Sequence, residues 1–305
     1  MPQHIIKTQN FTREFLLEFF NSVNEMKKMT QGKKADQLLI GRIVATLFYE
    51  ESTRTRLSFE AAAMRLGATV ISTASAKLFS SAAKGEILED TIRVLDSYCD
   101  CIVLRYHEEG GAARAAHVSR VPIINGGDGS GQHPTQSLLD LFTIYDEIGN
   151  IDGLSVALVG DLKHGRTVHS LAYLLGKFDN ITLYLIAPNN LTMPKEIIDY
   201  MGRHNVKFYQ ADDFCGIIDQ IDVLYQTRIQ RERFEIPEGY EASKGKLVVT
   251  RELANEMKTD SIILHPLPRV DEIRYGVDDN HRAKYFKQAE NGLYTRMALL
   301  KMLLS

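Results

Sequence analysis

Apolar runs typical of buried strands alternate with helix-like segments along almost the whole chain. The strand candidates are residues 43–48, 69–72, 101–104, 122–124, 155–159, 182–186, 207–209, 222–226 and 262–264. The helix candidates include residues 12–29, 57–66, 86–98, 135–148, 167–178, 195–203 and 282–304. Because parallel strands need a crossover helix between them, this alternation predicts an α/β fold of parallel sheets with helices on both faces.

A chain of 305 residues is long for a single hydrophobic core. The best boundary lies at residues 147–153, where Glu-Ile-Gly-Asn-Ile-Asp-Gly supplies turn residues between a helix and a strand. We therefore predict two doubly wound parallel-sheet domains, residues 1–149 and 150–285, linked by helices. The final helix, residues 286–305, is expected to pack back on the first domain.

The composition excludes several classes of protein. A formal net charge of −3 and a pI near 6.3 argue against a surface built mainly for nucleic acid. The first residues lack the pattern of a signal peptide and no apolar run approaches the length of a membrane span, so we expect a cytoplasmic protein with no membrane partner. The three cysteines, Cys99, Cys101 and Cys215, form no CxxC pair, which favours reduced thiols over a disulfide or a metal site.

The segment Ser52-Thr53-Arg54-Thr55-Arg56 follows the first strand candidate and opens a helix. A helix start leaves backbone N–H groups unpaired, and these groups favour a negative charge. Hydroxyl donors and two guanidinium groups on the same turn suit a phosphate or an acyl phosphate. The alternative is an ordinary N-cap whose arginines pair with Glu50 or Glu60.

Polar residues also follow the other strand candidates, where ligands bind in open α/β sheets. Arg105 follows one strand, and a glycine-rich loop, residues 126–131, leads from another to His133 and Gln136. Arg228 and the segment 265–269 follow two strands of the second half. Each residue alone would more often be an ordinary surface or structural group, but their joint placement favours a site for anions.

Residues 160–167 nearly match the phosphate-loop pattern GxxxxGK[ST]. Arg166 stands where that pattern requires lysine, and a guanidinium cannot follow the loop back to a nucleotide phosphate as lysine does. A helix start that presents Arg166 to a carboxylate is therefore the better interpretation.

Four segments in this order resemble the catalytic chains of the aspartate carbamoyltransferase family, within the aspartate/ornithine carbamoyltransferase superfamily. They are Phe48 to Arg56, His133 to Asp140, Gly160 to Thr167 and His265 to Arg269. The resemblance runs over nearly the full length. It implies transfer of the carbamoyl group of carbamoyl phosphate to the amine of L-aspartate, in pyrimidine (UMP) biosynthesis, at an active site between a carbamoyl phosphate-binding domain and an aspartate-binding domain.

The resemblance also implies roles for individual residues. Carbamoyl phosphate would be held by Ser52, Thr53, Arg54, Thr55, Arg105, His133, Gln136, Leu267 and Pro268. Aspartate would be held by Lys84, Arg166, Arg228 and Gln230. The catalytic groups would be Arg54, Thr55, Lys84, Arg105 and His133. Ser80 and Lys84 would reach into the site of a neighbouring chain, which implies a homotrimer with shared active sites. Regulatory chains could join such a trimer, and no cofactor or metal is implied.

Two features bear on the choice of substrate. The loop that carries Lys84 has one lysine, whereas relatives often carry two in succession. Ornithine carbamoyltransferases typically have a cysteine in the block where this chain has His265-Pro266-Leu267-Pro268, and arginines at positions 166 and 228 would repel the ammonium group of ornithine. The alternatives that remain are carbamoyl transfer to another amino acid and a non-catalytic protein that binds anionic metabolites.

Overall fold

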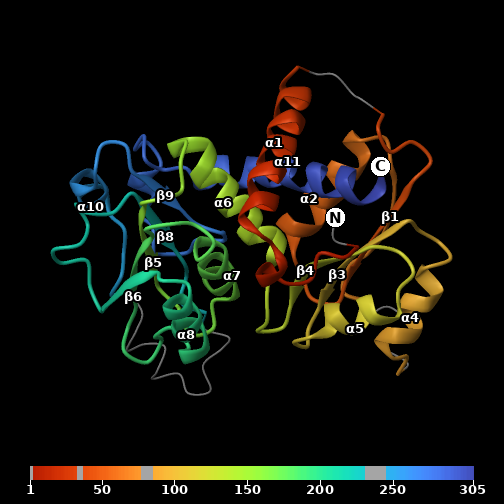
Figure 1. The fold of residues 1–305 in the computed structure, drawn as a ribbon, viewed down its shortest axis with the longest axis horizontal. Helices are drawn as coiled ribbons and strands as arrows, with labels where there is room; N and C mark the ends of the chain where they lie inside the picture. Colours follow the sequence, from red (N-terminus) through yellow and green to blue (C-terminus); the bar gives the residue numbers. More distant parts are fainter. Residues whose placement is uncertain (1–2, 33–36, 77–84, 231–244) are drawn as a thin grey trace. The chain divides into compact units, whose positions relative to one another are not determined.

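The computed structural model describes residues 3–32, 37–76, 85–230 and 245–305 (Figure 1). The chain divides into two compact units. One unit contains Met1–Leu139 and Glu290–Ser305, and the other contains Asp140–Ala289. Helices α6 (Pro134–Ile148) and α11 (Tyr285–Leu304) are the segments in which the chain passes from one unit to the other.

The sheet of the first unit has four parallel strands in the order β2-β1-β3-β4. The strands are β1 (Ile43–Phe48), β2 (Thr69–Thr73), β3 (Cys101–Tyr106) and β4 (Ile123–Asp128). The described helices of this unit include η1 (Thr8–Asn10), α1 (Arg13–Gln31), α2 (Thr53–Arg65), α4 (Leu88–Leu95) and α5 (Gly111–Val118). Central β1 and β3 are almost wholly buried, as expected for strands covered on both faces.

The sheet of the second unit has five parallel strands in the order β7-β6-β5-β8-β9. They are β5 (Ser155–Val159), β6 (Thr182–Ile186), β7 (Lys207–Ala211), β8 (Val223–Gln226) and β9 (Ile262–Leu264). Its described helices include α7 (Arg166–Leu175), α8 (Lys195–Arg203), α10 (Arg251–Glu256) and η4 (Tyr275–Val277). The order of the strands reverses between β5 and β8, so their carboxyl ends form the switch point where ligands bind in such sheets.

Apolar side chains from strands and helices form the core of each unit. In the first, Ile102 and Leu104 of β3 pack with Leu88 and Ile92 of α4. In the second, Val159 of β5 belongs to a buried cluster with residues of β8, α10 and α11. These contacts leave the carboxyl ends of the strands to polar loops.

The predicted fold class is confirmed, because both sheets are parallel and helices alternate with the strands. Four strands have the predicted bounds, namely β1, β5, β6 and β9. Two short helices, α5 and α10, were not predicted, and β4 continues through Gly126 and Gly127 to Asp128. The domain limits 1–149 and 150–285 stay a prediction.

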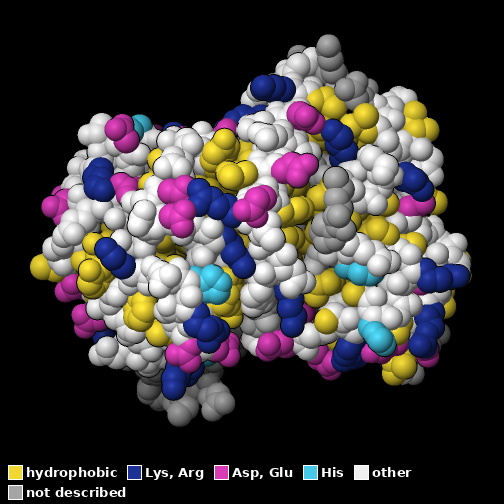
Figure 2. Space-filling view, viewed as in Figure 1, with side chains coloured by type: hydrophobic (Ala, Val, Ile, Leu, Met, Phe, Trp, Pro, Cys, Tyr) yellow, Lys and Arg dark blue, Asp and Glu magenta, His cyan; other side chains and the backbone are white. Residues whose placement is uncertain are grey.

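Acidic and basic side chains lie beside one another over the described part of the face in Figure 2. Among the described helices, none is long and apolar enough to cross a membrane. The described histidine, cysteine and carboxylate side chains include no group of three that could hold a metal ion. Cys99 and Cys101 are buried, and Cys215 is exposed.

Candidate active site

The start of α2 has the features of an anion site. Ser52 is the N-cap residue, and its side chain makes no capping hydrogen bond. The first backbone bond of the helix runs from Arg56 N to Ser52 O at 3.2 Å, and the first turn contains no acidic residue. The N–H groups before Arg56 and the positive end of the helix dipole therefore remain suited to an anion. Thr53 and Arg54 are exposed on this turn.

Thr55 brings two of the predicted motifs together. Its side chain is buried, and Thr55 Oγ1 lies 3.4 Å from His133 Nε2. His133 is also buried, and its Nδ1 lies 3.4 Å from Thr135 Oγ1. A hydroxyl and an imidazole thus meet within the first unit, although they are 78 positions apart in the sequence.

Arg105 lies near the end of β3 and its side chain is only 12% exposed. One guanidinium nitrogen, Nη1, donates to Gly126 O at 3.2 Å, and Nε lies 3.6 Å from Glu50 Oε2. The side chain is therefore oriented by the glycine-rich segment on one side and by a carboxylate on the other. Glu50 was considered only as a partner for the arginines of α2, so its contact with Arg105 was missed.

The glycine-rich loop before His133 is organised by Asp128. Asp128 Oδ1 accepts from Asn125 Nδ2 at 3.1 Å and from Gln132 N at 3.0 Å, and Oδ2 accepts from Gly110 N at 3.1 Å. Gly129 has φ +49°, and a Cβ there would lie 2.7 Å from a backbone nitrogen. This part of the loop is therefore needed to set the start of α6, at which His133 and Gln136 lie.

The loops after β5 and β8 are joined in the second unit. Thr227 Oγ1 donates to Val159 O at 2.9 Å and accepts from Asp161 N at 3.2 Å. Gly160 has φ +110°, and a Cβ at this position would lie 2.3 Å from Thr227 O. Only glycine allows this approach, which brings together the loop that leads to Arg166 and the loop that carries Arg228.

Arg166 is the first residue of α7 and is partly exposed. The turn before it is fixed by the buried Asp161, whose Oδ1 accepts from His164 N at 2.9 Å. A Cβ on Gly165 would lie 2.4 Å from Asp161 O, so this glycine allows the close packing of the turn on itself. Arg228 and Gln230 follow β8 and are also partly exposed.

The segment after β9 carries the remaining predicted residues. Leu267 has φ +56°, the left-handed region, and the Leu267–Pro268 peptide bond is cis. Glu272 lines a cavity of about 20 Å³ together with Gly160 and Thr227. The end of the segment 265–272 therefore lines the same cavity as the joined ends of β5 and β8.

Three predicted residues have other outcomes. Arg56 Nε lies 3.8 Å from Glu60 Oε1, and its Nη1 lies 3.5 Å from Ser72 Oγ, which confirms the ordinary interpretation for this arginine. Ser80 and Lys84 lie outside the described residues. Their predicted reach into a neighbouring chain stays a prediction.

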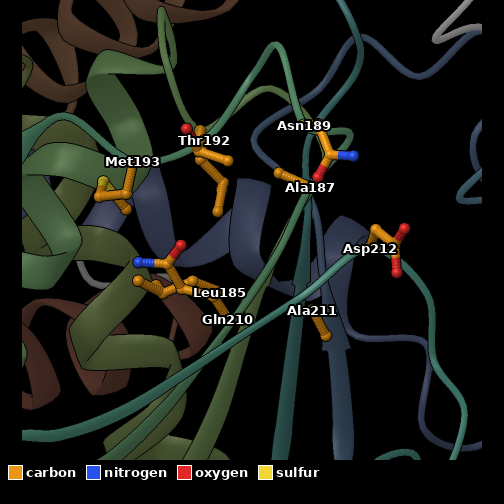
Figure 3. A pocket seen from close by; sticks show the side chains of 9 residues that line it. Leu185, Ala187, Asn189, Thr192, Met193, Gln210, Ala211 and Asp212 are labelled. Carbon is orange, nitrogen blue, oxygen red and sulfur yellow. The ribbon is translucent and has the colours of Figure 1, made fainter.

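A separate cavity of about 270 Å³ lies at the carboxyl ends of β6 and β7. Figure 3 shows Asn189 and Asp212 at one side of it, with Met193 and Gln210 at the other. None of the residues that line it is a predicted site residue.

Two family models cover most of the chain. The aspartate/ornithine carbamoyltransferase carbamoyl-P binding domain matches residues 3–146, and the Asp/Orn binding domain matches residues 152–303. The chain is 52% identical to an aspartate carbamoyltransferase catalytic subunit of Methanocaldococcus jannaschii, over 99% of this chain and 98% of that protein. It is also 52% identical to a chloroplastic aspartate carbamoyltransferase of Arabidopsis thaliana, over 98% of this chain and 77% of that protein.

Solved structures are similar over the same length. The catalytic subunit of M. jannaschii aspartate transcarbamoylase has a TM-score of 0.92 at 52% identity, over 99% of this chain and 98% of that one. A Trypanosoma cruzi aspartate transcarbamoylase in complex with N-(phosphonacetyl)-L-aspartic acid has a TM-score of 0.94 at 38% identity, over 99% and 96% of the two chains.

The prediction of a cytoplasmic location is contradicted by the plant relatives. The plant relatives from Arabidopsis thaliana and Oryza sativa are named chloroplastic, so proteins this similar are found in an organelle. The family assignment does not depend on the compartment, because the two family models and the relatives cover both units. The chain belongs to the aspartate/ornithine carbamoyltransferase family.

Proposed function

We propose that this protein is an aspartate carbamoyltransferase. It transfers the carbamoyl group of carbamoyl phosphate to the amine of L-aspartate and releases N-carbamoyl-L-aspartate and phosphate, as a step of pyrimidine (UMP) biosynthesis. The similarity to proteins of this name over nearly the full chain supports the assignment. The T. cruzi structure with N-(phosphonacetyl)-L-aspartic acid supports the pair of substrates, because that compound joins a phosphonate to aspartate.

The observation that carries the proposal is the contact of Thr55 with His133 beside the start of α2. The helix start would bind the phosphate of the donor, with Ser52, Thr53 and Arg54 on the same turn. Thr55, Arg105 and His133 would donate to the carbonyl oxygen as negative charge grows on it during attack. Gln136 would contact the same group.

Loss of one such donor commonly costs about 10²- to 10³-fold in rate. Holding two small molecules in attack geometry contributes as well, by up to roughly 7–11 kcal/mol in ideal cases. Positioning and electrostatics can therefore carry most of the reaction without a nucleophilic side chain. The oxygens of the departing phosphate are the proposed acceptors of the amine proton.

The acceptor is assigned to aspartate because Arg166 and Arg228 follow β5 and β8, the strands on either side of the switch point. Guanidinium groups bind carboxylates bidentately and repel the ammonium group of ornithine. Gln230 is assigned to the same substrate. Leu267 and Pro268 are assigned to the carbamoyl side.

The proposed assembly is a homotrimer in which Ser80 and Lys84 complete the site of a neighbouring chain. Mixing two inactive variants, Arg54→Ala and Lys84→Ala, tests this sharing. Partial return of activity on mixing is expected, because some shared sites then carry both original residues. No return of activity would contradict the shared site.

The reaction itself is tested with the purified protein, carbamoyl phosphate and either L-aspartate or L-ornithine. Carbamoylated product is expected with aspartate, and the Arg54→Ala variant should lose most turnover. Arg93→Ala is the matched control, because Arg93 is exposed on α4 and pairs with Asp90. Product with ornithine alone would assign another member of the family. If neither acceptor gave product, binding of N-(phosphonacetyl)-L-aspartate alone would favour a non-catalytic metabolite-binding protein.

A further inference from the structure

His265 is held in one tautomer by two groups that its ring contacts. The residue is buried directly after β9, and its Nδ1 lies 2.7 Å from Leu267 N. A backbone N–H can only donate, so Nδ1 must present its lone pair. The ring proton is then on Nε2, which donates to Glu272 Oε1 at 2.7 Å. The imidazole therefore joins the backbone of Leu267 to the carboxylate of Glu272.

Glu272 holds the other end of the same segment. Its second oxygen, Oε2, accepts from Val270 N at 3.2 Å and from Asp271 N at 3.1 Å. Burial of this carboxyl would raise its pKa, but the hydrogen bonds from His265 and from backbone N–H groups bring the pKa below its usual range. Glu272 is therefore a charged acceptor. It satisfies two backbone donors and one ring donor within the segment 265–272.

This support surrounds a residue with an unfavourable backbone conformation. Leu267 has φ +56°, which brings the Cβ of an L-residue close to the backbone. Such a conformation persists where neighbouring groups hold it, and it occurs often in ligand-binding turns. The hydrogen bond from Leu267 N to His265 is the contact that acts on this residue directly.

The imidazole is itself anchored in the core of the second unit. His265 N donates to Gln288 Oε1 at 2.8 Å, and Gln288 Nε2 donates to Asp140 Oδ1 at 2.6 Å. Asp140 Oδ2 accepts from Tyr225 OH at 2.7 Å. All four residues are buried, so hydrogen bonds connect His265 to Tyr225 of β8, which lies three residues before Arg228.

We propose that His265 and Glu272 are positioning residues that hold the Leu267-Pro268 turn in the conformation required for the carbamoyl side of the reaction. The inference rests on the proposed function, since that function assigns Leu267 and Pro268 to carbamoyl phosphate. Neither side chain contacts the substrate in this scheme. Both act through the backbone that they hold.

Two substitutions at one position separate the two contacts of the ring. In His265→Asn, Oδ1 replaces Nδ1 as the acceptor for Leu267 N–H, and the contact with Glu272 is lost. In His265→Gln, the terminal amide can reach Glu272 as Nε2 does, and the acceptor for Leu267 is lost. A packing role alone would not rank these variants by which nitrogen they replace.

The kinetic readout is kcat/KM for carbamoyl phosphate at saturating aspartate. His265→Gln is expected to lower kcat/KM by about tenfold, the typical effect of one lost hydrogen bond. His265→Asn is expected to have a kcat/KM much closer to that of the parent. Equal values for the two variants, whether both match the parent or both fall alike, would overturn the proposal. Thermal unfolding of each variant establishes the folded fraction used to normalise the rates.

Hydrogen exchange supplies a readout that does not need turnover. The amide of Leu267 should exchange faster in His265→Gln than in the parent or in His265→Asn. If the His265 variants fail to fold, Glu272→Leu decides, because its side chain has no oxygen that could accept from Val270 N or Asp271 N. Faster exchange of those two amides and a KM for carbamoyl phosphate about threefold higher are expected. Unchanged exchange would refute the positioning role. If the parent protein had no transferase activity but the variants showed the predicted exchange pattern, the proposed function would be refuted. The role of His265 and Glu272 in holding the turn would still be supported.

Discussion

The hydroxyl of Tyr225 makes a buried hydrogen bond whose removal has a measurable effect on stability. Tyr225 is fully buried in β8, and its hydroxyl donates to Asp140 Oδ2 at 2.7 Å. The change Tyr225→Phe keeps the ring and removes only this donor. Hydrogen bonds to charged groups contribute about 1.5–3 kcal/mol, so the variant should lose roughly that free energy of unfolding.

Thermal unfolding measures the stability that Tyr225→Phe loses. For a unit of this size, each kcal/mol changes Tm by about 2–4 °C, so Tyr225→Phe should lower Tm by roughly 3–12 °C. Tyr184→Phe is the matched control, because that hydroxyl makes a 3.2 Å bond to Gln220 Oε1 at the surface. A surface substitution of this kind should change stability by less than about 0.5 kcal/mol. Equal Tm values for the two variants would refute the reasoning.

The pH dependence of the same variant has a defined sign. Burial, followed by the neighbouring Asp140, raises the pKa of Tyr225 well above its ordinary value. The folded hydroxyl therefore stays protonated, while that of the unfolded chain ionises near pH 10. The stability that Tyr225 contributes should be constant below about pH 10 and should fall as the pH rises further, because only the unfolded state gains from ionisation. Above about pH 10, the difference in free energy of unfolding between the parent and Tyr225→Phe should therefore become smaller.

Three further substitutions test the site and its scaffold. Thr55→Val should lower kcat by about 10²-fold through loss of the buried hydroxyl. The control Thr69→Val, at an exposed strand position, should leave kcat and KM at the parent values. A similar kcat for both variants would remove Thr55 from the mechanism. Arg56→Ala should keep kcat within about threefold of the parent, because Arg56 contacts only structural partners among those named above, Glu60 and Ser72. A fall in kcat as large as that of Arg54→Ala would contradict this assignment. Gly160→Ala should destabilise the protein by more than about 2 kcal/mol and raise the KM for aspartate, because the added Cβ would lie 2.3 Å from a carbonyl oxygen. The control is Gly202→Ala, in a helix where no atom lies within 4 Å of the added Cβ. In urea unfolding this control should be neutral or stabilising.

The sequence predicted the parts of the fold that depend on local pattern. Strands such as β5 and β6 are short apolar runs with turn residues on both sides, so their limits follow from the residues themselves. Helix α5 was missed because Gly-Ala-Ala-Arg-Ala-Ala-His-Val lacks the large apolar residues that mark a buried face. The continuation of β4 through two glycines depends on pairing with β3, a contact that no local pattern contains.

The placement of the candidate residues could be predicted to a similar extent, and their roles stay a prediction. Positions near strand ends could be predicted because parallel strands end at one edge of a sheet. Arg228 follows β8 as predicted, whereas Arg105, predicted to follow its strand, lies inside β3 one residue before the strand ends. The groups that orient them were mostly missed, since Glu50 and Asp128 act through contacts that form only in the folded chain. Glu272 gave no signal beyond an acidic residue near a Pro-Leu-Pro segment, and its burial decides its role.

The bonds from Thr227 to Val159 O and Asp161 N have a consequence for the redesign of acceptor specificity. The loops that carry Arg166 and Arg228 share one hydroxyl and one glycine contact, so neither loop can be lengthened or replaced without moving the other. A new acceptor amino acid would therefore require that both loops be exchanged together, as one transplanted module. If Arg166 and Arg228 bind aspartate as proposed, single substitutions at either position would remove that binding without building a pocket for another substrate.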